Sequence, residues 1–495
     1  MSKKCTIVFL DEVRAKVKGL DPKTTNKCID KLKFLVPYRF HIASYRLGRW
    51  DGSIRFFEKT GKTYINLLED VIPIIASEGY DFDFEDNRNH QNLVVPKISN
   101  DLFAEHLWPD GHFMEGQPIM LRDDQVEAAN IFADNRYGLQ VLATGFGKTL
   151  LTAAVCKVVE PMGRTLTIVP SQSLVEQTAD DFKLVDMDVG RYYADAKEPD
   201  HHHVITTWQS LNEIIEGKDV DTFHRMTDGI IQVIVDECHG IKAKSLENML
   251  GKYLNQVPIR RGFTGTIPKE IFDEKTIVAH IGNVINRVTA KELQDKGILS
   301  RCHVNCMITK ESNKFTTYDQ ETKFLNTNPE RLTFIADFVN KVTETGNTLI
   351  LVNSVAAGEE LNDMIPNSTF VYGKVKVKER KSAYQSVQKS NNKVIIATYQ
   401  VAAVGINIPR IFNLVMVEAG KSFVRVIQTI GRGIRVAKDK DFVNIWDISS
   451  DSKFSKKHLK ARLEYYDEAE YPHEDYKGTY REILESISGE DEDES

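Results

Sequence analysis

The sequence predicts an α/β protein in which two tandem domains, each with a parallel sheet, follow a small α+β N-terminal domain and precede an acidic C-terminal tail. From about residue 118, short runs of β-branched residues alternate with longer helical segments, as in parallel strands buried between helices. These runs form two sets, one before about residue 288 and one after about residue 300. The 495 residues are enough for two to four domains.

The bulk composition indicates a soluble globular chain. Hydrophobic residues make up 41% and charged residues 27%, which excludes fibrous and wholly disordered classes. No apolar run approaches the roughly 18 residues that cross a bilayer, so we expect no membrane association and a cytoplasmic location. Six scattered cysteines suit reduced thiols. Cys302, His303 and Cys306 lie close together, but a single such group is more often coincidence than zinc.

We expect an N-terminal domain at 1–95 that binds nucleic acid. Cations and aromatic rings are interleaved between residues 31 and 62, and they suit phosphates and stacked bases. Arg46, Arg49, Trp50 and Arg55 are the candidate contacts. The alternative, that the aromatics only form a core, has equal weight on composition, and for Trp50 it is slightly favoured. The acidic stretch Asp81–Asp86 and the polar residues after it predict a linker.

The two α/β domains are predicted at 96–290 and 291–453. Their clearest strands are the apolar runs Thr165–Val169, Val204–Thr207, Ile230–Val235, Thr348–Val352 and Val394–Thr398. Residues 454–495 are predicted to be a C-terminal helical, acidic tail. The stretch from 464 onward carries a net charge of −11, which leaves a mildly basic body although the whole chain has a net charge of −7.

A glycine loop between a strand and a helix predicts phosphate binding. Apolar residues up to Leu142 precede the loop and a helical run, 150–159, follows it, so that backbone N–H groups and a helix N-terminus would surround phosphates. Lys148 would contact the β- and γ-phosphates and the Thr149 hydroxyl would bind Mg²⁺. Leu142 replaces the first glycine of the usual pattern. The loop residues expected to bind ATP are Thr144, Gly145, Phe146 and Gly147.

Two further groups complete a predicted ATPase. Asp236 and Glu237 end an apolar strand, where Asp236 would hold Mg²⁺ and Glu237 would orient and deprotonate water. Arg432 and Arg435, three residues apart on one predicted helix face, would neutralise the γ-phosphate in the transition state. A nucleotide held between two domains would make hydrolysis a switch for domain closure.

These elements, in this order over about 118–450, resemble the superfamily 2 helicases. The resemblance implies two RecA-like domains, ATP with Mg²⁺ between them, and a nucleic-acid strand across both. Arg122 and Gln125 resemble the adenine-reading motif, and Thr264-Gly265-Thr266 resembles the motif that couples hydrolysis to strand movement. The other implied site residues are Ser171, Thr207, Gln209 and Thr398 for the nucleic acid, and Gly405 and Gln428 in the second domain's motifs.

The segment Tyr45–Arg55 also resembles the front domain of the phage UvsW-type helicases, and more distantly the XPB-like and RecG-like proteins. That resemblance implies a helicase that unwinds or branch-migrates forks, Holliday junctions and R-loops in recombination, repair or replication, with DNA and RNA:DNA hybrids as partners. Three alternatives remain: an RNA helicase, a double-strand translocase that does not unwind, and a nucleic-acid-binding scaffold switched by ATP. The acidic tail and nearly complete glycine loop depart from the UvsW pattern.

Overall fold

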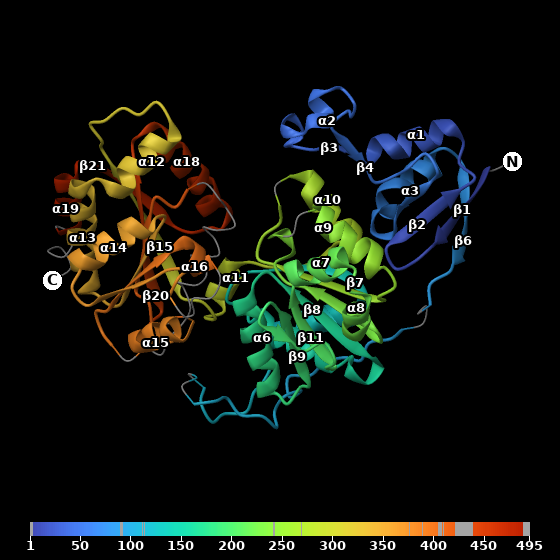
Figure 1. The fold of residues 1–495 in the computed structure, drawn as a ribbon, viewed down its shortest axis with the longest axis horizontal. Coiled ribbons are helices and arrows are strands. Elements are labelled where there is room, and N and C mark those ends of the chain that lie inside the picture. Colours follow the sequence, from blue (N-terminus) through green and yellow to red (C-terminus); the bar gives the residue numbers. More distant parts are fainter. Residues whose placement is uncertain are drawn as a thin grey trace. The chain divides into compact units, whose positions relative to one another are not determined.

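The computed structural model describes residues 3–89, 93–110, 112, 114–240, 243–268, 270–375, 377–388, 390–403, 408, 410–420 and 439–488. The chain forms two compact units (Figure 1). The first contains Met1–Leu142 and Gly147–Arg287, and the second contains Ala143–Phe146 and Val288–Ser495. In the described part of the chain, no helix has both the length and the apolar character that a membrane span requires.

The first unit begins with a four-stranded sheet in the order β5-β2-β1-β6. Its strands are β1 (Lys3–Phe9), β2 (Arg14–Lys18), β5 (Lys62–Tyr64) and β6 (Tyr80–Asp86). Its helices are α1 (Pro22–Lys31), η2 (Ile65–Leu67) and α3 (Leu68–Ser77). Residues 33–55, here called the hairpin lobe, extend from this sheet and contain β3 (Lys33–Leu35), η1 (Arg39–His41), α2 (Ala43–Arg46) and β4 (Ser53–Arg55).

The predicted linker at Asp81–Asp86 is wrong, because these residues belong to β6, which pairs in parallel with β1. Acidic side chains alternate there with Phe82 and Phe84, and that period of two is the strand pattern. Phe82 packs against the N-terminal core and Phe84 stacks on Phe9. The linker prediction relied on the many acidic residues of this segment and overlooked their alternation with the aromatic residues.

The N-terminal sheet packs on the α/β part of the same unit through α10 (Ile271–His280). Phe272 and Val278 of α10 belong to the same buried cluster as the apolar residues of the N-terminal sheet. Lys275 pairs with Asp70 at 2.6 Å, and the Asn66 amide donates to the Val278 carbonyl at 3.0 Å. The N-terminal sheet is therefore joined to the first α/β domain by a continuous core.

The α/β part of the first unit has an eight-stranded sheet in the order β10-β9-β11-β8-β12-β13-β7-β14. Its strands are β7 (Tyr137–Leu142), β8 (Arg164–Val169), β9 (Val189–Tyr193), β10 (Ala196–Lys197), β11 (His203–Thr207), β12 (Ile230–Val235), β13 (Ile259–Thr264) and β14 (Val284–Val288). Strands β9, β11, β8, β12, β13 and β7 pair in parallel. Every residue of β12 is buried, as expected for a parallel strand covered on both faces.

Helices connect these strands, and several begin at side-chain caps. The helices are α4 (Asp123–Asp134), α5 (Lys148–Lys157), η3 (Glu160–Met162), α6 (Gln172–Leu184), α7 (Trp208–Gly217), α8 (Val220–Thr227), η4 (Cys238–Gly240), α9 (Ala243–Leu246) and the π-helical η5 (Glu247–Tyr253). Ser171 and Thr207 accept hydrogen bonds from the first turns of α6 and α7, respectively. Such N-caps explain where these two helices start.

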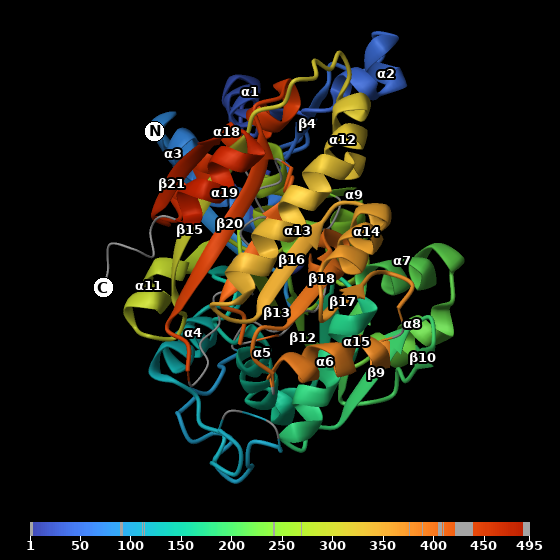
Figure 2. The ribbon, with the colours of Figure 1, turned by 90° about the vertical axis from the view of Figure 1, so that its left-hand side faces the viewer.

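The second unit has a seven-stranded sheet in the order β17-β18-β16-β19-β20-β15-β21, and all of its pairs are parallel (Figure 2). Its strands are β15 (Arg301–Thr309), β16 (Thr348–Val352), β17 (Ser368–Val371), β18 (Val394–Thr398), β19 (Asn413–Val417), β20 (Phe442–Ser450) and β21 (His473–Gly478). Its helices are α11 (Ala290–Asp295), α12 (Tyr318–Thr327), α13 (Pro329–Thr343), α14 (Val355–Met364), α15 (Val377–Gln388), α16 (Tyr399–Ala403), α18 (Lys453–Glu468) and α19 (Tyr480–Ser488).

The expected helical tail at 454–495 needs correction. Helices α18 and α19 lie within it, but β21 between them adds an edge strand to the second sheet beside β15. The strand sequence His-Glu-Asp-Tyr-Lys-Gly is mostly polar, which is common at a sheet edge and gives no hydrophobic signal. Residues 473–488 thus belong to the second domain, and residues 489–495, the most acidic part, lie outside the described residues.

Candidate nucleotide-binding site

Three neighbouring parallel strands end at the same edge of the first sheet and bring the predicted ATPase residues together. Strands β12, β13 and β7 are adjacent, and they are followed by Asp236-Glu237, by Gly265 and by the glycine loop. The carboxyl edge of a parallel sheet is where ligands bind in open α/β folds. This order explains why residues about ninety positions apart in sequence meet.

Lys148 and Glu237 form the centre of the site. The Lys148 Nζ lies 3.3 Å from Glu237 Oε1 and donates to the Leu142 carbonyl, also at 3.3 Å. The side chains of Lys148 and Glu237 are only 14% and 16% exposed. The amine is therefore held at the start of α5 between the end of β7 and the acidic residue after β12.

The glycine loop needs its glycines. Gly145 and Gly147 have φ of +93° and +89°, the left-handed region that a side chain disfavours. A Cβ at Gly147 would also lie 2.5 Å from Gln125 Nε2, so the loop passes directly against that side chain. Of the other predicted loop residues, Phe146 is fully buried, whereas Thr144 and Thr149 are half-buried.

The predicted adenine-reading residues lie beside this loop at the start of α4. The Gln125 amide donates to the Gly147 carbonyl at 3.4 Å, and the Gln125 carbonyl accepts from the Arg122 backbone at 3.0 Å. The Arg122 guanidinium donates to Asp124. Gln125 thus connects this motif to the glycine loop within the first unit.

Two acidic neighbours have opposite pKa shifts. Burial, and then the adjacent Glu237 carboxylate, raise the pKa of Asp236 to about 7. Burial alone would raise the pKa of Glu237 as well, but the Lys148 ammonium and His239 lower it. The two neighbouring carboxylates therefore differ in how readily each is protonated. Glu237 also has a φ of +46°, a strained value for a residue other than glycine.

Some hydrogen bonds of the site involve residues that were not predicted as site residues. They join Glu237 and His239 to residues at the end of β13. The Gly265 N–H donates to Glu237 Oε2 at 3.2 Å, and His239 Nδ1 lies 2.7 Å from Thr264 Oγ1. Because the Thr264 hydroxyl donates to the Thr266 carbonyl, it accepts from His239, which assigns the proton to Nδ1. Both His239 and Thr264 stand inside motifs visible in the sequence, and that position was the available signal.

The candidate nucleic-acid residues of the two sheets lie at carboxyl edges. Thr207 is the last residue of β11, Ser171 follows the adjacent strand β8, and Thr398 is the last residue of β18. Thr207 and Thr398 are only 3% and 7% exposed, whereas Gln209 is exposed. Thr207 also caps α7, so its hydroxyl has a structural partner.

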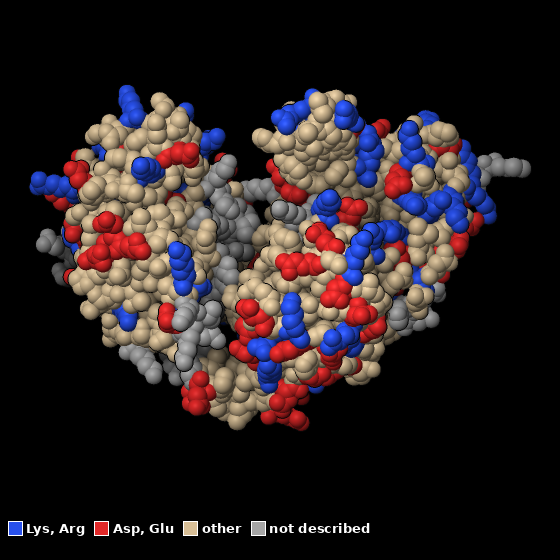
Figure 3. Space-filling model, in the orientation of Figure 1, with Lys and Arg blue, Asp and Glu red and all other residues tan. Residues whose placement is uncertain are grey.

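The hairpin lobe carries the other candidate contacts. Arg46 and Arg49 are exposed, and neither has an ion-pair partner among the described residues, whereas Arg55 pairs with Asp51. The Trp50 indole donates to the Ser53 carbonyl at 2.8 Å and its ring packs edge-on against Tyr45. Lys and Arg side chains are visible on this lobe and the adjoining helices in Figure 3.

Four predicted site residues belong to the motifs of the second domain. Gly405, Gln428, Arg432 and Arg435 lie outside the described residues. The described site residues are those that follow β7, β12 and β13 and those at the start of α4.

Comparison of the sequence with known proteins agrees with the helicase resemblance of the predicted motifs. Residues 118–269 match the family model of the type III restriction enzyme res subunit, and residues 330–437 match that of the helicase conserved C-terminal domain. The ATP-dependent DNA helicase uvsW of Enterobacteria phage T4 is 24% identical over 451 residues, covering 86% of this chain and 87% of the relative. The pre-mRNA-splicing ATP-dependent RNA helicase PRP28 of Debaryomyces hansenii is 24% identical over 297 residues, covering 55% and 50%.

A solved structure with the same fold is the ATP-dependent Type ISP restriction-modification enzyme LlaBIII bound to DNA. It has a TM-score of 0.57 and 13% identity, and the match covers 94% of this chain and 40% of that one. The described sheets and the two family matches agree on two RecA-like domains. The chain belongs to the superfamily 2 helicases, a family that uses ATP with a divalent metal, and it is similar to the UvsW-type members.

Proposed function

We propose that this protein is an ATP-dependent DNA helicase or translocase that unwinds or branch-migrates forks, Holliday junctions and R-loops in recombination, repair or replication. The observation that carries the proposal is the Lys148–Glu237 pair beside Asp236 at the carboxyl edge of the first sheet. The relative that covers most of the chain is by name a DNA helicase.

For hydrolysis, each residue of the site has a distinct task. Lys148 would leave Glu237 for the β- and γ-phosphates, which frees the Glu237 carboxylate to orient and deprotonate water. Thr149 and Asp236 are the residues that would hold Mg²⁺, which when bound neutralises phosphate charge. Arg432 and Arg435, with Gln428, would act on the γ-phosphate from the second domain.

Nucleic-acid binding would use both sheets and the hairpin lobe. In the first unit Ser171, Thr207 and Gln209 would contact the nucleic acid, and in the second unit Thr398 would do so. The lobe adds Arg46 and Arg49, which have no ion-pair partner in the part of the chain that the structure describes, and it also exposes Tyr38, Phe40 and Leu47. Cations next to exposed rings suit the phosphates and unstacked bases of a branch point better than a regular duplex.

The test compares four substrates at equal ATP: a four-way junction, a fork, a plain duplex and an RNA:DNA hybrid. We expect the junction and the fork to be processed at least tenfold faster than the duplex. Equal rates on all four would remove the branch-remodelling proposal. The double variant Arg46→Glu/Arg49→Glu should lose most of that preference and keep its ATP turnover without DNA.

A matched control reverses two charges on the N-terminal sheet from which the hairpin lobe extends. Lys4 and Lys18 are exposed and each already pairs with an acidic residue, so Lys4→Glu/Lys18→Glu should keep the branch preference. An equal loss in both double variants would indicate a general effect of net charge.

An RNA helicase is the second candidate, because one relative is by name a splicing RNA helicase. A single-stranded RNA that stimulates ATP turnover more than DNA would favour it. Translocation along duplex DNA without strand separation would favour the non-unwinding translocase, and nucleic-acid affinity that changes with bound ATP but without turnover would favour the scaffold.

A further inference from the structure

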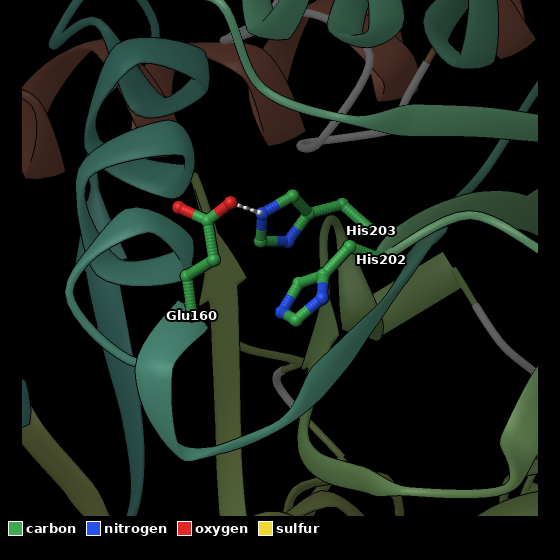
Figure 4. A group of neighbouring side chains, drawn as sticks. All are labelled: Glu160, His202 and His203. Atoms are coloured by element: carbon green, nitrogen blue, oxygen red, sulfur yellow. Dashed lines mark ion pairs between the residues drawn. The ribbon is translucent and has the colours of Figure 1, made fainter.

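A cluster of two histidines and one glutamate lies at the amino ends of strands in the first sheet, and the ATPase residues lie at the carboxyl ends. Glu160 begins η3, just after α5, and His202 and His203 stand at the start of β11. One possible ligand atom from each lies within 4.8 Å of the others (Figure 4). The cluster faces the amino ends of β8 and β11, whereas Asp236 and the glycine loop follow carboxyl ends.

His203 is buried with one ring nitrogen unused. Its side chain is 1% exposed, and its Nδ1 shares a hydrogen bond of 2.8 Å with Thr165 Oγ1. Its Nε2 is buried without any hydrogen-bond partner. Buried polar atoms are nearly always satisfied, so an unpartnered one in a native site calls for an explanation such as an ion.

A carboxylate oxygen of Glu160 lies near this nitrogen. Glu160 Oε1 lies 3.8 Å from His203 Nε2, which is too far for a hydrogen bond. The other oxygen, Oε2, is held by Lys157 Nζ at 2.6 Å. Two ligands of one tetrahedral zinc ion lie about 3.3 Å apart when each bond is about 2.0–2.1 Å. A closure of about half an ångström would therefore place both atoms on one ion.

A backbone carbonyl fixes the proton position on His202, the third member of the cluster. Its Nε2 lies 3.1 Å from the Gly163 carbonyl, which can only accept, so Nε2 carries the hydrogen and Nδ1 keeps the lone pair. The His202 and His203 rings are 5.0 Å apart between centroids. A backbone carbonyl that fixes the tautomer of a metal-binding histidine is a common outer contact.

We propose that Glu160, His202 and His203 form a zinc site, with water as the fourth ligand. Two imidazoles and one carboxylate favour Zn²⁺ over Mg²⁺ or Ca²⁺, which prefer oxygen ligands. The Lys157 charge offsets that of Glu160, so the imidazoles supply much of the affinity. The ion ties the turn after α5 to β11. Because α5 begins at Lys148, the ion anchors the far end of the helix that carries the catalytic lysine, about 15 Å away along ten residues.

The experiment uses the full chain without a histidine tag, treated with a chelator and then titrated with ZnCl₂ or CoCl₂. The variants are Glu160→Gln and His203→Ala, and the matched control is His201→Ala. His201 is the neighbouring histidine, but it pairs with Asp188 at 2.6 Å outside the cluster. We expect wild type and His201→Ala to bind one zinc per chain and to develop the visible absorption bands of tetrahedral Co²⁺.

Both cluster variants should lose at least tenfold in zinc affinity. Zinc at about a hundredfold excess over its Kd should raise the Tm of wild type by about 5 °C and that of the variants by much less. If His203→Ala does not fold, Glu160→Gln decides the test, since Glu160 is only partly buried. The proposal is overturned if wild type binds no zinc, if Glu160→Gln keeps its affinity, or if His201→Ala loses as much affinity as His203→Ala.

Discussion

The replacement Glu237→Gln tests the nucleotide site most specifically. Glu237 accepts from two donors at once, Lys148 Nζ at 3.3 Å and the Gly265 N–H at 3.2 Å. A glutamine has one acceptor oxygen, so its amide N–H group would face one of these donors and one contact is lost. The replacement also removes the carboxylate that we assign as the base for the attacking water.

The expected effect follows from that loss of proton transfer. General-base catalysis contributes about 10²–10⁴-fold in rate, equivalent to about 3–5 kcal/mol in the barrier. We therefore expect the kcat for DNA-stimulated ATP hydrolysis to fall by at least about a hundredfold, with nucleotide and DNA affinity within a few-fold of wild type. The assay is steady-state phosphate release, together with nucleotide binding by fluorescence.

Glu176→Gln provides the matched control. Glu176 pairs with Arg191 and accepts from Tyr193, away from the glycine loop, so this variant should hydrolyse ATP normally. A kcat for Glu237→Gln within threefold of wild type would refute the assigned role. An equal loss in both variants would indicate general destabilisation of the domain.

Three further predictions follow from the contacts described. Thr264→Val removes the hydroxyl that accepts from His239, so strand displacement per ATP hydrolysed should fall while ATP turnover persists, and equal losses of both would contradict this coupling role. Mg²⁺ requires the deprotonated Asp236, whose pKa is about 7 in the ligand-free protein. The affinity for Mg²⁺-ADP, measured by titration calorimetry, should therefore fall by up to about tenfold per pH unit below 7. The affinity of Asp236→Asn should lack this dependence on pH. Arg331 is fully buried between Glu311 at 2.9 Å and Glu418 at 2.7 Å, so Arg331→Ala should destabilise the second unit by about 3–5 kcal/mol in urea unfolding followed by Trp446 fluorescence, whereas a change below about 1 kcal/mol would show that this network is not needed.

The strands most visible in the sequence were those buried on both faces. The predicted runs at Ile230–Val235, Thr348–Val352 and Val394–Thr398 coincide with β12, β16 and β18. Continuous apolar residues are required there because helices cover both sides of a parallel sheet. The edge strands β6 and β21 were missed because most of their residues are polar, so neither strand contains a continuous apolar run.

The candidate site, too, could be predicted from the sequence only in part. The meeting of Lys148 with Asp236 and Glu237 could be predicted, because parallel strands bring their carboxyl ends to one edge. The bond between His239 and Thr264 could not, since a single sequence does not tell which polar side chains of two loops face one another. Glu160 and the histidines at 202 and 203 are separated by about forty residues without a recognisable ligand spacing, so only the fold reveals their proximity.

We propose above all that branched DNA stimulates ATP hydrolysis at the site that contains Lys148. The most direct measurement is the ATP hydrolysis rate of wild type and Lys148→Ala, with and without a saturating four-way junction, alongside the junction affinity of each. We predict at least tenfold stimulation for wild type, no measurable hydrolysis for Lys148→Ala under either condition, and junction affinities within threefold of each other. Junction-stimulated hydrolysis that survives in Lys148→Ala would contradict the account.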